Sequence, residues 1–369
     1  MDRQTSAFFA ILESGLWETG IGRPECFPLD AGQWEDVFRM SVRQTVTGIT
    51  YRGLLHLPEK FLPPVQLLVR WTSEADRIER GNFRMDSALV SLNGFFLENG
   101  IRPVLQKGQG VAAMYRYPAA RECGDIDLYF TAEEERVRAE ELVRKAGCRV
   151  RSMPDGSSSY RWKGIEVEHH GRLVDICSPF RKKHVDSFIG KYGFEDMKLH
   201  SDAGDTCIMV PSPMLNLLML NAHVFKHASG WGIGMRQICD MAVACSVLRE
   251  RIDFDEMRAM ERKAGLAGWS AVLYSFMEKY LALEWNSYAC TGRASSRAGR
   301  LLDTVLEGGN FGFYTRASMK PGGPLWRRKL RTAGAFLRNC GFSMGVAPGE
   351  AFWAFVSLVA GQKHNYGKQ

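Results

Sequence analysis

The hydrophobic pattern of this chain changes its period twice, near residues 101 and 211, and each change restricts the folds that it can adopt. Apolar residues recur at helical spacing from residue 34 to residue 97, and Asn99-Gly100 is typical of a helix end. From Ile101 the pattern becomes strand-like. Short strands are predicted at 102–106, 126–130, 148–153, 159–163 and 165–170, with a hairpin turn at 155–156.

The second change, after Pro213, returns the chain to a helical pattern. Helices are predicted at 213–228, 234–250, 254–263, 267–282 and 297–306, and glycine-containing loops at 308–312 and 320–324. We therefore expect an α+β fold in which a small mixed sheet is flanked by helical parts. The expected domains are an N-terminal helical region (1–100), an α/β core (101–210) and a C-terminal helical domain (211–369).

Composition restricts the function only broadly. Of the 369 residues, 45% are apolar and 24% are charged, and the net charge of +7 suits polyanions in general, nucleotides and nucleic acids included. The nine cysteines form no C-x-x-C pair, which argues against a disulfide framework or a zinc ribbon and favours a reducing cytoplasm. The N-terminus does not resemble a signal peptide, and the apolar run at 351–361 is about half as long as a bilayer requires. We expect a cytoplasmic protein without a membrane span.

Two aspartates lie two residues apart at the apolar strand predicted at 126–130, with Asp125 directly before its first residue and Asp127 inside it. Residues two apart leave the same face of a strand, so their like charges repel each other unless a cation lies between them. Mg²⁺ prefers oxygen ligands and retains waters and substrate phosphates, which makes it the obvious cation. An isolated D-x-D fits a half-exposed edge strand equally well, so the neighbouring sequence has to decide.

Two basic features precede these aspartates. The turn Lys107-Gly108-Gln109-Gly110 follows a predicted strand and opens a predicted helix, an arrangement that can present backbone N–H groups to a phosphate. Glycine turns more often serve strand-to-helix geometry alone. Arg121 could neutralise a triphosphate or lie on the surface.

The strand predicted at 165–170 carries two further carboxylates, Glu166 and Glu168, on one face. A third carboxylate beside a D-x-D pair is what a two-metal site requires, because one ion also activates the attacking hydroxyl. Without the two aspartates, plain solvent-facing alternation would explain this pattern.

Several of these motifs occur together and in order. The runs KGQGVAAMYRYPAARECGDIDLYF, VEHH and HVFKHASGWGIGMRQICD resemble those of an uncharacterised nucleotidyltransferase-fold family of bacteria, a branch of the polymerase-beta-like superfamily. The resemblance covers about residues 30 to 315, including the GGNFG loop. It implies that residues 101–210 form the nucleotidyltransferase core.

The resemblance implies that Asp125 and Asp127 bind two metal ions, Mg²⁺ or Mn²⁺, and that Glu168, the acid of E-x-H, completes the site. The chain departs from the superfamily at Gly108. In the superfamily a Gly-Ser turn precedes the aspartates at a shorter distance, whereas here Gln109 and a longer insertion follow the glycine.

In the helix predicted at 213–228, His223 and His227 lie one turn apart, with Lys226 beside them. An H-x-x-x-H pair can bind zinc, but neither a metalloprotease glutamate nor an evident third ligand accompanies this pair. We expect these side chains to line the nucleotide or acceptor cleft, with structural packing of His223 as the alternative.

Two further charged features have simple structural explanations. Arg236 and Asp240 lie four residues apart and fit an intrahelical salt bridge or a contact to substrate. The basic stretch at 326–331, with Arg338 beyond it, is best explained as a solvated helix face, because no aromatic ladder accompanies it.

These features predict a metal-dependent enzyme that transfers a nucleoside monophosphate from an NTP, with ATP as the expected donor, to an acceptor hydroxyl and releases pyrophosphate. Lys107 and Arg121 would offset the charge on the phosphates. The acceptor is a small molecule, a peptide or RNA. The alternatives are a nucleotide- or RNA-binding regulator that has lost turnover, and a toxin-like modifier of tRNA or protein.

Overall fold

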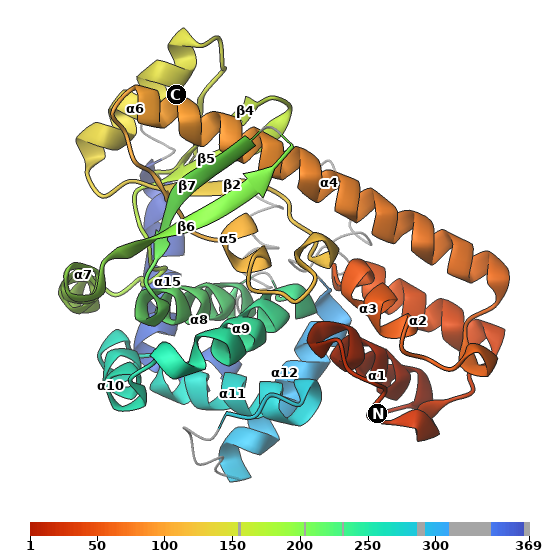
Figure 1. The fold of residues 1–369 in the computed structure, drawn as a ribbon. Coiled ribbons are helices and arrows are strands. Elements are labelled where there is room, and N and C mark those ends of the chain that lie inside the picture. The colour runs from red at the N-terminus through yellow and green to blue at the C-terminus, as the bar shows by residue number, and fades with distance from the viewer. Residues whose placement is uncertain (154–155, 203, 231, 286–291, 310–340, 365–369) are drawn as a thin grey trace.

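The central sheet is mixed, as the sequence predicts. The computed structural model describes residues 1–153, 156–202, 204–230, 232–285, 292–309 and 341–364. The strands in this part of the chain are β1 (Val104–Leu105), β2 (Ile126–Tyr129), β3 (Arg151–Ser152), β4 (Ser158–Trp162), β5 (Ile165–His170), β6 (Phe194–Ser201) and β7 (Gly204–Pro211). They form one sheet in the order β3-β4-β5-β2-β1-β7-β6 (Figure 1). The pairs β1–β7 and β2–β5 are parallel, and the other pairs are antiparallel.

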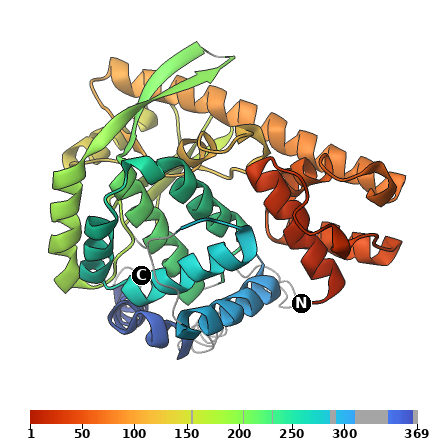
Figure 2. The ribbon, with the colours of Figure 1, turned by 60° about the horizontal axis from the view of Figure 1, so that its bottom comes forward.

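The N-terminal hundred residues are helical, as predicted. They form α1 (Arg3–Trp17), α2 (Ala31–Arg43), α3 (Thr47–Leu54) and α4 (Val65–Glu98). The 34-residue α4 reaches from the other N-terminal helices to the sheet, where it packs on β6 and β7 (Figures 1 and 2). Gly100, with φ +68°, ends the helical segment in a conformation that favours glycine.

Alternation along β2 decides which face of the sheet carries charge. Ile126 and Leu128 are buried in an apolar cluster with the C-terminal half of α4 and with α6 (Glu133–Lys145). Asp127 and Tyr129 therefore point to the opposite face. There Tyr129 joins a larger apolar cluster that includes the helices after residue 211. The strand thus directs Asp127 toward the C-terminal helices.

All five helices predicted after Pro213 are present. They are α8 (Pro213–Ser229), α9 (Met235–Leu248), α10 (Phe254–Ala264), α11 (Ala267–Leu281) and α12 (Gly292–Gly308). A further helix, α15 (Pro348–His364), lies beyond the last predicted one. Most predicted ends agree within two residues, and α12 begins earlier than predicted. Among the described helices, none combines the length and the apolar composition that a bilayer crossing needs.

The sequence pattern did not predict α7 (Pro179–Tyr192) or the hairpin of β6 and β7. Charged residues in β6, such as Glu195 and Lys198, hide its strand pattern, and the hairpin extends the sheet beyond β1. The strand predicted at 148–153 shrinks to the two residues of β3. The loop at 320–324 and the basic stretch with Arg338 lie outside the described residues, as do parts of the predicted turns at 155–156 and 308–312.

A buried carboxyl group holds α8 to the helices behind it. Glu261 of α10 is 0% exposed, and its Oε1 accepts hydrogen bonds from Asn221 Nδ2 and Tyr274 OH, both at 2.9 Å. Burial raises the pKa of Glu261 to about 7. Because Asn221 precedes His223 and Lys226 on α8, this contact helps to position that helix.

We predict that the free energy of unfolding decreases as the pH rises from 4.5 to about 7, because the folded protein prefers protonated Glu261. The contribution of this group is roughly 3 kcal/mol, since one pKa unit corresponds to about 1.4 kcal/mol. Urea unfolding across this pH range should show a smaller decrease in Glu261→Gln than in the wild type. The exposed Glu284→Gln is the matched control, and an unchanged pH dependence in Glu261→Gln would contradict the assignment.

Candidate active site

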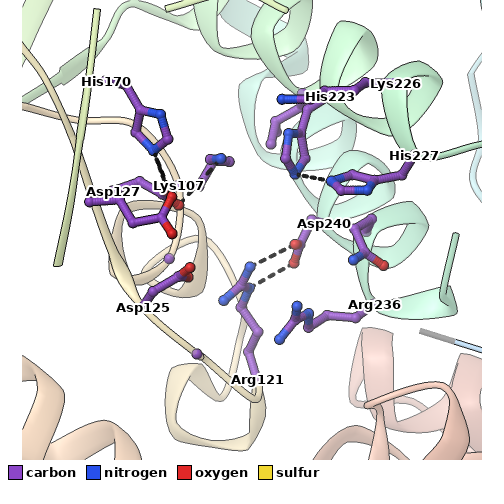
Figure 3. Close-up of a pocket in the computed structure, with 15 residues that line it drawn as sticks. Lys107, Arg121, Asp125, Asp127, His170, His223, Lys226, His227, Arg236 and Asp240 are labelled. Atoms are coloured by element: carbon purple, nitrogen blue, oxygen red, sulfur yellow. Dashed lines mark hydrogen bonds and ion pairs between the residues drawn. The ribbon is translucent and has the colours of Figure 1, made fainter. Parts of the chain in front are cut away.

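One pocket collects the side chains that the sequence singles out for chemistry. It lies between the sheet and the helices α8 and α9, with a cavity volume of about 230 Å³ (Figure 3). Of the four carboxylates proposed for the metal site, Glu166 lies outside its lining. The lining residues are Lys107, Gly108, Arg121, Gly124, Asp125, Asp127, Glu168, His170, Leu220, His223, Lys226, His227, Arg236, Gln237 and Asp240.

The sheet side of the pocket carries the carboxylates. Asp127 on β2 and Glu168 on β5 are direct partners in the parallel register, so they leave the sheet side by side. Asp125 stands immediately before β2. The ligand atoms of Asp127, Glu168 and His170 all lie within 4.8 Å of one another, which is close enough for one metal ion to contact all three.

Charge repulsion among these acids appears in their pKa values. The charge of Asp127, followed by burial, raises the pKa of Asp125, and burial together with both aspartates raises the pKa of Glu168. Burial alone would also raise the pKa of Asp127, but Lys107 and His170 outweigh it and hold that pKa well below its ordinary value. The site therefore holds more negative charge than its neighbours compensate, which is a condition that a divalent cation would relieve.

Lys107 enters the pocket from a turn that only glycine permits. Gly108 has φ +57° and ψ −118°, and a Cβ atom there would lie 3.2 Å from the carbonyl oxygen of Asp125. The helix that follows, α5 (Gln109–Ala112), is a single turn, so its dipole offers little to a phosphate. The functional group that this turn presents is the ammonium of Lys107, which lies 3.3 Å from Asp127 Oδ2.

The opposite wall carries two imidazoles and an ammonium from α8. His223 Nδ1 donates to Asp175 Oδ2 at 3.2 Å, and Lys226 Nζ donates to Asp175 Oδ1 at 2.9 Å. His223 and His227 face each other through their Nε2 atoms, 3.2 Å apart. Burial, together with nearby Lys107, lowers the pKa of His223 to about 4, so its ring is neutral at pH 7 and its Nε2 accepts from His227.

Arg121 is paired inside the protein. Its guanidinium donates to both carboxylate oxygens of Asp240 at 2.7 Å, and Tyr115 OH also donates to Asp240. The suggested intrahelical pair of Arg236 and Asp240 is thus replaced by a contact across 119 residues. Arg236 lines the pocket and donates instead to the backbone oxygen of Glu122 at 2.8 Å.

The two glutamates of β5 have different neighbours. Glu166 faces Arg161 on β4 and accepts from its Nε at 3.2 Å, away from the pocket. Glu168 lines the pocket beside Asp127. Sequence reasoning missed His170 and Asp175, although the E-x-H motif contained His170, and no pattern in the sequence marked Asp175.

Comparison with known proteins assigns the chain to a family. A family model described as uncharacterised nucleotidyltransferases matches residues 30–278. The chain belongs to this family. The match spans every residue that lines the pocket and ends before the GGNFG loop. No curated protein and no solved structure matches the chain.

We predict that Arg121→Met lowers the free energy of unfolding of this nucleotidyltransferase by roughly 3–5 kcal/mol, because it leaves the buried Asp240 charge without its partner. Arg236→Met is the matched control. Its loss should be about 1 kcal/mol, since its main bond is to a backbone oxygen. Denaturant unfolding measures both values, and equal losses would contradict a stabilising buried pair of Arg121 and Asp240.

Proposed function

We propose that this protein transfers a nucleoside monophosphate from an NTP, with ATP as the expected donor, to an acceptor hydroxyl, and that pyrophosphate leaves. In this proposal residues 101–210 form the catalytic core, between an N-terminal helical region (1–100) and a C-terminal helical domain (211–369). The observation that carries the proposal is the register of β2 and β5, which sets Glu168 beside Asp127. Family membership supports the same reaction class.

The donor set suits divalent cations. Asp125, Asp127 and Glu168 would hold Mg²⁺ or Mn²⁺, since both ions prefer carboxylate oxygens and retain water and phosphate ligands. The chemistry that such ions supply when bound is charge neutralisation on the triphosphate and polarisation of the acceptor hydroxyl. His170, bonded to Asp127 Oδ1 at 2.6 Å, would orient that carboxylate.

The cationic side chains of the pocket would bind the triphosphate. Lys107 and Lys226 carry ammonium groups, and His223 and His227 line the same wall. We assign a phosphate contact to Arg236, because the guanidinium of Arg121 already faces Asp240 through two bonds. Arg121 would then act by holding the loop that leads to Asp125. Positive side chains lower the barrier most where they face the negative charge that develops on the leaving pyrophosphate.

The acceptor hydroxyl would approach on the Glu168 side of the carboxylates. An acid placed there contributes mainly in the transition state, when the hydroxyl loses its proton and attacks the α-phosphorus in line with the leaving pyrophosphate. The proton passes to solvent or to a nearby base. Retention of three converging carboxylates argues against the alternative of a regulator that has lost turnover.

We predict that Glu168→Gln reduces pyrophosphate release by about two orders of magnitude or more while NTP binding changes little, as expected when an interaction made in the transition state is removed. Glu166→Gln is the matched control on the same strand. Because Glu166 bonds to Arg161 outside the pocket, the activity of the Glu166→Gln variant should stay near that of the wild type. A larger loss in Glu166→Gln than in Glu168→Gln would contradict the placement of the third carboxylate.

A further inference from the structure

Both carboxylate oxygens of Asp127 are already engaged by side chains of the protein. Lys107 Nζ lies 3.3 Å from Oδ2, and His170 Nε2 donates to Oδ1 at 2.6 Å. The side chains of Asp127 and Lys107 are only 8% and 17% exposed, so solvent screens this ion pair weakly. Lys107 therefore acts as the counter-ion of the carboxylate that the proposed function assigns to metal binding.

A divalent cation and this ammonium cannot both lie against Asp127 without strong repulsion. Like charges repel more strongly as the distance between them falls and as solvent screening weakens, and a divalent charge doubles that repulsion relative to a unit charge. A metal ion that binds Asp127 must therefore move Lys107 away, and the lost ion pair weakens metal binding.

Lys107 has two other anionic partners within reach of its charge. Although burial would lower its pKa, Asp127, Asp175 and Asp125 together raise that pKa. Asp175 is already bonded to His223 and Lys226, so it can accept little more positive charge. A triphosphate in the pocket would be a better partner, because it brings several negative charges with it.

We propose that Lys107 is an internal counter-ion that metal and triphosphate displace together, so that the two ligands bind cooperatively. Without NTP, Lys107 competes with the metal for Asp127. With NTP, the phosphates receive Lys107, and Asp127 is free to bind the metal. This inference rests on the proposed function and adds cooperative binding to it. Because linkage is reciprocal, the metal must tighten NTP binding by the same factor by which NTP tightens metal binding.

The test measures binding of Mn²⁺ alone, of an ATP analogue with a methylene bridge between the α- and β-phosphorus alone, and of each in the presence of the other, by calorimetry. In the wild type each ligand should tighten the other at least tenfold. Lys107→Met should bind Mn²⁺ alone at least fivefold more tightly than the wild type, bind the analogue more weakly, and lose most of the cooperativity.

Lys226→Met is the matched control, because Lys226 lines the same pocket but pairs with Asp175. It should weaken analogue binding without tightening Mn²⁺ binding. The proposal is overturned if Lys107→Met binds Mn²⁺ no more tightly than the wild type, or if Lys226→Met tightens it equally. The melting temperature of each variant shows whether it is folded, and Lys107→Gln provides a second variant without the ammonium in case Lys107→Met misfolds. Failure of the proposed function would look different, since the wild type would then bind neither Mn²⁺ nor the analogue in any combination.

Discussion

Mutual repulsion among Asp125, Asp127 and Glu168 is the constraint around which the pocket is organised. The parallel pairing of β2 and β5 fixes Asp127 beside Glu168, so the acids cannot separate without breaking the sheet. The charge of Asp127 helps to raise the pKa values of Asp125 and Glu168, so this group of acids requires positive charge nearby. The glycine turn at Gly108 delivers Lys107 to this point, and the opposite wall supplies further cations.

The pocket also requires that its sheet wall and its helical wall stay in a fixed position relative to each other. The bond between Arg121 and Asp240 joins the loop before β2 to α9, and Glu261 joins α8 to the helices behind it. In both contacts, removal of one buried group would leave its partner without a hydrogen bond or a counter-charge. The contacts therefore favour this arrangement of the walls over others and also stabilise it. The carboxylates thus belong to the sheet, but the pocket depends on the C-terminal helices.

Local patterns in the sequence predicted the elements that have a clear period. The helices after Pro213 and the strand that carries Asp127 were predicted because their apolar residues repeat regularly. The β6–β7 hairpin was missed because its strands are partly exposed and charged. Local sequence patterns also could not predict pairings between residues that are distant in the sequence. Spacing suggested that Asp240 pairs with Arg236 one turn away, whereas tertiary structure brings Arg121 to it, and Asp175 had no motif to mark it.

In the proposed reaction the protein transfers the α-phosphoryl group of an NTP together with its nucleoside. The most direct measurement compares ATP labelled at the α-phosphorus with ATP labelled at the γ-phosphorus, each incubated with the protein, Mn²⁺ and a cell extract as the source of acceptor. We expect α-label to enter a new product and γ-label to appear only in pyrophosphate, and we expect Asp127→Asn to abolish both changes. Transfer of γ-label to the product, or equal α-transfer by wild type and Asp127→Asn, would contradict the account.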